Sequence, residues 1–220
     1  MRLQKLALRA AIICLTIILP ACSDPAPATP LGPTSNEVTI GTQTWMTRNL
    51  SVALFRNGDT IPEAKNNEEW VKAASEGKPA WCYYKNDQTN NARYGKIYNW
   101  FAVNDPRGLA PEGWHVASID EWNSLIQFLG GEQNAGKRLK ATEDWSDPAN
   151  SDNSSGFWAL PSGFRDDDNF AVPGTFAMYW TSTEKDSVNA RYVVMYTGDT
   201  DAPTYFISKA HGYSVRCIKN

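Results

Sequence analysis

Hydrophobic residues recur at helical spacing after Ser118. The stripe consists of Ile119, Trp122, Leu125, Ile126 and Leu129. Ser118 and Glu121 have the spacing of a capping box, in which the serine hydroxyl accepts from the backbone N–H of Glu121 and the glutamate reaches back to the N–H of Ser118. Gly130-Gly131 is a typical helix end. The pattern predicts an amphipathic helix between these two signals.

The same spacing predicts shorter helices elsewhere. Residues 94–101 read as one, ended by the proline and turn residues of 104–108. Its apolar face would carry Tyr94, Ile97, Tyr98 and Phe101. Residues 67–76 have an asparagine cap, two early acids and Gly77 behind them, which predicts another helix. Residues 134–140 predict a further helical turn.

Alternating and continuous apolar runs predict strands. Residues 38–46 read as a hairpin around Gly41-Thr42, and Asn57-Gly58 is a strong hairpin signal. Further strands are predicted at 80–84, 156–160, 175–183, 190–196, 204–208 and 213–218, the last three forming a meander. Hairpins, then helices, then strands indicate an α+β fold with a largely antiparallel sheet and two to three short helices.

Four stretches together resemble one family. They are YGKIYNWFAVNDPRGLAPEGWHVASIDEW at 94–122, IGTQTWMTRNL at 40–50, YWTSTE at 179–184 and HGYSVRCIKN at 211–220. The combination is similar to the Fibrobacter succinogenes major paralogous domain (FISUMP) family of bacterial lipoproteins. The resemblance implies an extracytoplasmic domain with a C-type-lectin-like fold, in which the first and last strands pair, and it implies no settled activity.

The first 21 residues have the pattern of a lipoprotein signal peptide. A charged start precedes a short apolar core, which is too short to span a membrane. Leu19-Pro20-Ala21-Cys22 resembles a lipobox, so Cys22 is expected to carry lipid; the alternative is an ordinary secretory signal with a chance cysteine. Residues 22–36 form a Pro-rich tether and residues 37–220 one domain. We expect the lipid to hold the chain to the outer membrane, facing the periplasm or the surface.

Charge and cysteine content narrow the class of protein. Without residues 1–21 the chain has 18 basic and 24 acidic residues, a net charge of −6. This balance argues against a nucleic-acid partner, which favours a basic surface. Cys82 and Cys217 are the cysteines of the predicted domain, and an oxidising compartment favours a disulfide between them. Two buried free thiols are the alternative.

Catalytic motifs are absent from the sequence. The chain has two histidines, His115 and His211, and contains no GxSxG, HExxH or Walker sequence. We expect His115 to be a structural residue bonded to backbone and His211 to lie solvated in a turn. A Cys/His nucleophile pair would require a free cysteine near His115. The protein is therefore expected not to be an enzyme.

An acidic run offers a candidate metal site. Asp166, Asp167, Asp168 and Asn169 supply hard oxygen ligands of the kind that calcium prefers, with Asp166 and Asp168 as the candidate pair. EF-hand spacing and the Glu-Pro-Asn and Gln-Pro-Asp sequences of calcium-dependent lectins are absent. A solvated acidic loop is the favoured interpretation, and no cofactor is expected.

Aromatic residues are the remaining functional signal, because their rings can stack on sugars. Most should be core; Trp114, Trp122, Trp158 and Trp180 lie in regular segments and are predicted to be buried, whereas Trp145 is predicted to be exposed. The candidate ligand-binding residues are Asp105, Arg107, Trp145, Arg165, Asp166, Asp167 and Asp168. We expect a non-catalytic domain that binds a glycan or an envelope protein. The alternatives are a structural or adhesion component of the envelope and, third, an enzyme acting on envelope polymers.

Overall fold

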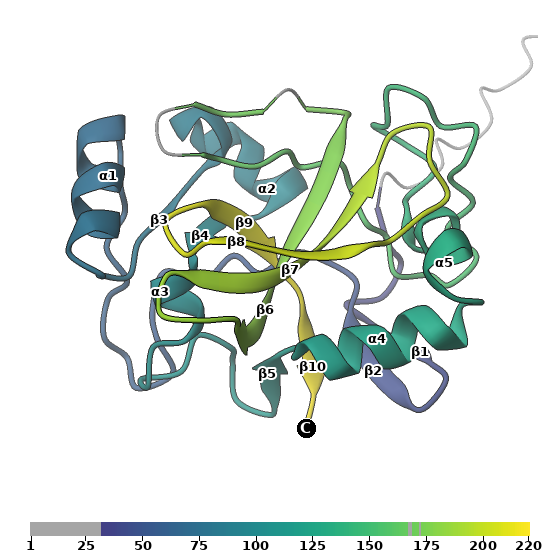
Figure 1. Cartoon of the computed structure of the whole chain (residues 1–220), viewed down its shortest axis with the longest axis horizontal. Coiled ribbons are helices and arrows are strands. Elements are labelled where there is room, and N and C mark those ends of the chain that lie inside the picture. Colours follow the sequence, from purple (N-terminus) through teal and green to yellow (C-terminus); the bar gives the residue numbers. More distant parts are fainter. Residues whose placement is uncertain (1–31, 167–168, 172) are drawn as a thin grey trace, which may run out of the picture. The chain divides into compact units, whose positions relative to one another are not determined.

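The structure is a computed structural model and describes residues 32–166, 169–171 and 173–220. The predicted signal peptide, the lipidation residue Cys22 and the aspartates Asp167 and Asp168 lie outside these residues. Over the described ranges, no helix is both long and apolar enough to cross a membrane. The chain has the predicted α+β content, arranged as two sheets with helices packed against them (Figure 1).

The smaller sheet joins the beginning of the domain to its end. Its order is β1 (Glu37–Ile40), β2 (Gln43–Met46), β10 (Cys217–Lys219) and β5 (Trp114–Val116), all antiparallel. The predicted hairpin at 38–46 is confirmed, with Gly41 at a φ of 62° in its turn. The expected pairing of the first and last strands is wrong in detail: β10 pairs with β2 through Ile218 and Trp45, and β1 lies on the other side of β2.

The larger sheet contains most of the C-terminal strands. Its order is β3 (Trp81–Cys82), β4 (Ile97–Asn99), β9 (Gly212–Val215), β6 (Phe176–Glu184), β7 (Asn189–Tyr196) and β8 (Thr204–Ser208). The sheet is antiparallel except where β9 runs parallel to β6. The predicted three-strand meander is therefore wrong at its last step. Residues 213–218 divide at Arg216 into β9 and β10, because β9 fills the centre of one sheet and β10 belongs to the other.

Three helices of eight residues or more occur in the described part of the chain, together with two single α-helical turns. They are α1 (Asn67–Ser75), α4 (Ile119–Phe128) and α5 (Glu132–Leu139); the turns are α2 (Asn91–Tyr94) and α3 (Trp100–Val103). The predicted capping box of α4 is present, with both hydrogen bonds between Ser118 and Glu121. Two short 3-10 helices, Tyr84–Asn86 and Gln88–Asn90, precede α2.

The predicted helix at 94–101 is wrong. The chain leaves α2 through Gly95 at a φ of 72°, a conformation that L side chains rarely adopt, and then forms β4. Tyr98 of β4 pairs with Trp81 on one side and Tyr213 on the other. Asn99 then caps α3 by accepting from the backbone N–H of Ala102. Long-range strand pairing thus overrides a helical spacing of aromatic residues.

Two predicted strands are also shorter than expected. Of residues 80–84 only Trp81–Cys82 form a strand, and Tyr84 begins a 3-10 turn. Of residues 156–160 only Ala159 forms a bridge, with Lys140. Trp158 has a φ of 62°, so this segment cannot continue as a strand.

Buried aromatic rings form much of the core. α4 packs against both sheets: between ring centroids, Trp122 lies 4.9 Å from Trp45 of β2 and 5.5 Å from Tyr179 of β6. In the larger sheet, Trp180 lies 4.5 Å from Tyr213. Rings at these spacings bury large apolar area and add ring–ring attraction.

Cys82 and Cys217 are free, buried thiols, so the predicted disulfide is not formed. Cys82 lies on β3 of the larger sheet and pairs with Ile97, whereas Cys217 lies on β10 of the smaller sheet and pairs with Val116. The two residues also belong to different core clusters. Burial raises the pKa of both thiols to about 12, which keeps them protonated and unreactive at neutral pH.

Candidate functional site

The structure does not assemble the predicted ligand-binding residues into one site. Asp105 and Arg107 form an ion pair at 2.8 Å, and Arg107 also reaches Asp59 at 3.3 Å. The guanidinium of Arg107 lies 4.1 Å from the ring centroid of Phe55. Hydrogen bonds from Arg107 hold the pKa of Asp105 below its ordinary value. These charges satisfy one another in a partly buried cluster.

Trp145 and Arg165 are buried rather than exposed. Trp145 is 5% exposed, and its indole N–H donates to the carbonyl of Ala159, so the prediction that it is an exposed ring is wrong. Arg165 is fully buried and donates to the side chain of Asn67 at 2.7 Å. Its guanidinium lies 4.8 Å from the ring centroids of Trp70 and Phe170. Both residues pack inside the protein because apolar neighbours from distant parts of the chain cover them.

The acidic loop is only partly described, because Asp167 and Asp168 lie outside the described residues. Asp166 accepts from the backbone N–H of Asn169 and donates its own N–H to the carbonyl of Asn169, which closes a turn. No group of three or more His, Cys, Asp or Glu side chains arranged for a metal ion occurs within the ranges that the structure covers.

Two tryptophans remain partly accessible, and each lines a different pocket. Seven of the nine tryptophans are at most 5% exposed, whereas Trp114 and Trp158 are intermediate, contrary to the prediction that both are buried. Trp114 lines an open groove and Trp158 lines a small cavity, and Arg48 and Asn49 line both. Residues of the segment that follows β2 therefore line both pockets, one beside each partly accessible indole.

The groove beside Trp114 has a volume of about 290 Å³. We call it the Trp114 groove; its lining residues are Asn36, Glu37, Met46, Arg48, Asn49, Leu50, Ser51 and Trp114. Trp114 lies on β5, the edge strand of the smaller sheet, opposite Lys219 of β10. The ammonium of Lys219 lies 5.6 Å from the Trp114 ring centroid and pairs with Glu37 at 3.0 Å. A half-buried indole thus lies beside charged and polar groups on the edge strand of the smaller sheet.

The polar side chains of the Trp114 groove differ in whether they already have hydrogen-bond partners. The amide of Asn49 donates to the carbonyl of Tyr94 and accepts from Arg216, so it is already satisfied. Asn36 and Arg48 are exposed, and Arg48 makes no ion pair with any residue that the structure describes. Together with Glu37, these side chains can bind hydroxyl or carboxylate groups of a ligand lying on the Trp114 indole.

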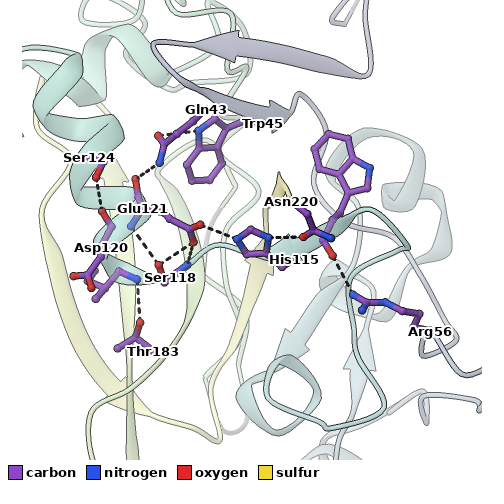
Figure 2. A network of polar contacts seen from close by, with 12 residues as sticks. Gln43, Trp45, Arg56, His115, Ser118, Asp120, Glu121, Ser124, Thr183 and Asn220 are labelled. Carbon is purple, nitrogen blue, oxygen red and sulfur yellow. Dashed lines mark hydrogen bonds and ion pairs between the residues drawn. The ribbon is translucent and has the colours of Figure 1, made fainter.

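A polar network holds the opposite side of β5 (Figure 2). His115 Nε2 lies 2.7 Å from Glu121 Oε1, and Nδ1 lies 2.8 Å from Asn220 Oδ1. Glu121 Oε2 accepts from the backbone N–H and the hydroxyl of Ser118, both at 2.8 Å. His115 is thus bonded to side chains rather than to backbone as expected, and it ties β5 to the start of α4 and to Asn220 (Figure 2).

Arg56 also holds β5 in place, through hydrogen bonds to Trp114 and to the loop before it. Its guanidinium donates to the carbonyl of Ala110 at 3.1 Å and to the carbonyl of Trp114 at 3.0 Å. Because the His115 network and Arg56 both hold β5, the indole of Trp114 is presented by a firmly bonded strand. Such pre-organisation reduces the entropy cost of binding a ligand.

Glu121 makes the stability of this network dependent on pH. Burial disfavours its charged form, but hydrogen bonds from Ser118 and His115 outweigh burial, so the pKa of Glu121 lies below its ordinary value of 4.5. A carboxyl with a depressed pKa stabilises the folded state above its unfolded pKa, and that contribution is lost as pH falls through the folded pKa.

We expect urea unfolding to show a smaller loss of stability between about pH 5 and 3 in Glu121→Gln than in the wild type. The control is Glu68→Gln, which replaces an exposed carboxyl on α1 and should show the same pH profile of stability as the wild type. Equal pH profiles for Glu121→Gln and the wild type would contradict the role given to Glu121.

Comparison with known proteins identifies the family of the chain. Searches of curated proteins and of solved structures gave no match. The C-type-lectin-like fold stays a prediction. The sequence model described as the Fibrobacter succinogenes major domain matches residues 38–219, which is most of the chain. The chain therefore belongs to the Fibrobacter succinogenes major domain family.

Proposed function

We propose that this domain binds a carbohydrate in the Trp114 groove, without catalysis, as part of a lipid-anchored protein of the cell envelope. The observation that carries the proposal is the half-buried indole of Trp114 beside Asn36, Glu37 and Arg48. An accessible aromatic face can stack on the C–H face of a sugar ring while neighbouring polar groups bind its hydroxyls. The groove volume of about 290 Å³ suits one or two sugar units of a longer chain.

The residues that could act as acid, base or nucleophile support a non-catalytic function. Both oxygens of Glu121 already accept hydrogen bonds, and both ring nitrogens of His115 face side-chain oxygens. Cys82 and Cys217 are buried with raised pKa values. A catalytic group needs access to substrate and a pKa suited to its task, and these residues serve packing and hydrogen bonding instead.

We further propose that Cys22 carries the lipid that holds the domain to the outer membrane, with the tether of residues 22–36 between them. The lipobox-like sequence before Cys22 supports this arrangement.

A structural or adhesion role is the second candidate function. It is supported by β8, the edge strand of the larger sheet, on which Tyr205 is 49% and Phe206 is 52% exposed. Val188, in the turn before β7, is 60% exposed. An exposed apolar edge can pair with a strand of another protein.

A glycan array separates the two candidates. We would screen the unlipidated chain of residues 22–220 carrying Cys22→Ser, with calcium and with chelator. Carbohydrate binding is expected to persist in chelator, because the proposed contacts come from side chains of the Trp114 groove. Trp114→Ala should weaken the affinity for the bound glycan by roughly 30-fold or more, the effect of removing a central aromatic contact.

Phe206→Ala is the matched control, because it removes an exposed aromatic ring from another sheet. It should leave carbohydrate affinity unchanged. Chelator-sensitive binding would favour the acidic loop around Asp166 over the Trp114 groove. An array without binding, together with an envelope protein whose binding is lost in Phe206→Ala, would support the structural role instead.

A further inference from the structure

The lining of the Trp114 groove carries one cation that no acid neutralises. Arg48 is exposed and lines the groove, and it makes neither an ion pair nor a hydrogen bond with a residue of the described ranges. Among those ranges, Glu37 supplies the only carboxylate of the lining, and Lys219 pairs with it at 3.0 Å. Since that pair has no net charge, the charge of Arg48 remains.

A second cation lies buried behind the same lining residues. Arg216 is 1% exposed and donates to the carbonyl of Met46 and to the side chain of Asn49, both at 2.8 Å. It also donates to the carbonyl of Phe157 at 2.6 Å. All three acceptors are neutral, and Arg216 forms no ion pair within the part of the chain that the structure covers. Its charge is therefore not cancelled locally.

Two more cations are bonded to lining residues of the groove. The ammonium of Lys96, a buried residue, donates to the carbonyl of Ser51 at 3.0 Å. The guanidinium of Arg56 donates to the carbonyl of Trp114 at 3.0 Å (Figure 2). Neither is in an ion pair with a described residue, although Glu63 attracts Lys96 from a greater distance.

These four cations give the Trp114 groove a positive potential, although the whole chain has a net charge of −3. The charges of Arg216 and Lys96 are buried, so water and salt screen them less than they screen exposed charges. Their N–H groups bond protein acceptors, so they attract an anion through charge alone. Arg48 differs, because its guanidinium fork is available to a planar carboxylate, which it can bind through two parallel hydrogen bonds.

We propose that the Trp114 groove takes an acidic carbohydrate, one whose ring bears a carboxylate as in a uronic acid. This inference rests on the proposed function and narrows it to one class of glycan. The sugar ring stacks on Trp114, its carboxylate pairs with Arg48, and its hydroxyls bond Asn36 and Glu37. A neutral sugar makes the same stacking contact but leaves the charge of Arg48 uncompensated.

Carboxyl reduction provides a matched pair of probes, because it converts a uronic acid into the neutral sugar with the same ring. We would titrate the unlipidated chain with oligosaccharides of galacturonate, mannuronate and glucuronate and with their carboxyl-reduced forms. At least one acidic oligosaccharide should bind, and its reduced form should bind roughly tenfold or more weakly. Added salt should weaken the binding of the acidic form only. Equal affinity for the acidic and reduced forms would overturn the inference.

Arg48→Gln tests the residue that pairs with the carboxylate. Arg48 is exposed, so its replacement leaves the core intact. Affinity for the acidic oligosaccharide should fall by about the factor that carboxyl reduction costs the wild type, and affinity for the reduced form should not change. Arg138→Gln, which removes an exposed arginine from α5, should leave both affinities as in the wild type. An undiminished preference for the acidic form in Arg48→Gln would contradict the role of Arg48.

The outcomes separate this inference from the proposed function. If neutral glycans bind, lose affinity in Trp114→Ala, and no acidic oligosaccharide binds more tightly, carbohydrate binding in the groove stands and the acidic specificity is overturned. If no acidic, reduced or neutral glycan binds, both are overturned.

Discussion

Replacing Arg216 by alanine is expected to lower the free energy of unfolding by about 3–5 kcal/mol. The substitution leaves Asn49 and the carbonyls of Met46 and Phe157 without their buried donor. It also removes a guanidinium that lies 4.3 Å from the ring centroid of Phe157. Arg216 bonds three separate segments at the point where the chain passes from one sheet to the other, so the loss affects both sheets.

Urea unfolding measures this effect, with Arg138→Ala as the control. Arg138 is exposed on α5, and its replacement should change stability by less than about 0.5 kcal/mol. Arg216→Lys retains the charge but supplies fewer fixed donors, so its stability should lie between wild type and alanine. A loss of less than about 1 kcal/mol in Arg216→Ala would show that the hydrogen bonds of Arg216 contribute little.

Gly136→Ala is expected to destabilise the protein by about 2–4 kcal/mol, although alanine normally stabilises a helix relative to glycine by about 1 kcal/mol. A Cβ on Gly136 would lie 1.9 Å from the carbonyl oxygen of Asp201 and 2.8 Å from that of Thr200. These are backbone atoms, and the backbone N–H of Lys137 donates to the carbonyl of Thr200 at 3.0 Å. The helix α5 must therefore move away from the 200–202 segment to admit a methyl group.

Gln133→Ala on the exposed side of α5 is the matched control, and it should be neutral or slightly stabilising because of helix propensity. Equilibrium unfolding in urea measures whether each variant is more or less stable than the wild type. If Gly136→Ala were as stable as the wild type, the close approach of α5 to Asp201 would be wrong.

Local signals in the sequence predicted the parts of the fold that local interactions determine. The helix α4 follows from the Ser118 and Glu121 capping box and an apolar stripe, which all lie within a dozen residues. The first hairpin follows from alternation around Gly41. These elements form from neighbouring residues, so their pattern needs no knowledge of the rest of the chain.

Long-range contacts determined the parts that the sequence did not predict. Residues 94–101 have helical spacing, yet Tyr98 pairs with Trp81 and Tyr213 in a sheet. Arg165 lies in an acidic loop by sequence, yet it packs beside Trp70 and Phe170. Tyr213 is 115 residues from Tyr98 (213 − 98), and Trp70 is 95 residues from Arg165 (165 − 70), so neither contact is visible in the local sequence pattern.

The candidate site was missed for the same reason. Trp114 was predicted to be buried because it belongs to a regular apolar segment, and its accessibility arises from the position of β5 at the edge of its sheet. Trp145 was predicted to be exposed because it lies beside acids in an irregular stretch of the sequence. In the structure it belongs to the same core cluster as Ala135 and Leu139 of α5 and is buried.

The most direct test of carbohydrate binding at Trp114 is fluorine NMR of the unlipidated chain labelled with 5-fluorotryptophan, titrated with the oligosaccharide that binds on the array. The resonance that disappears in Trp114→Phe reports on the groove. Binding in the Trp114 groove predicts that this resonance shifts most as the ligand saturates, while those of buried residues such as Trp122 and Trp180 stay in place. Saturation of the protein with no shift of the Trp114 resonance would contradict the proposed site.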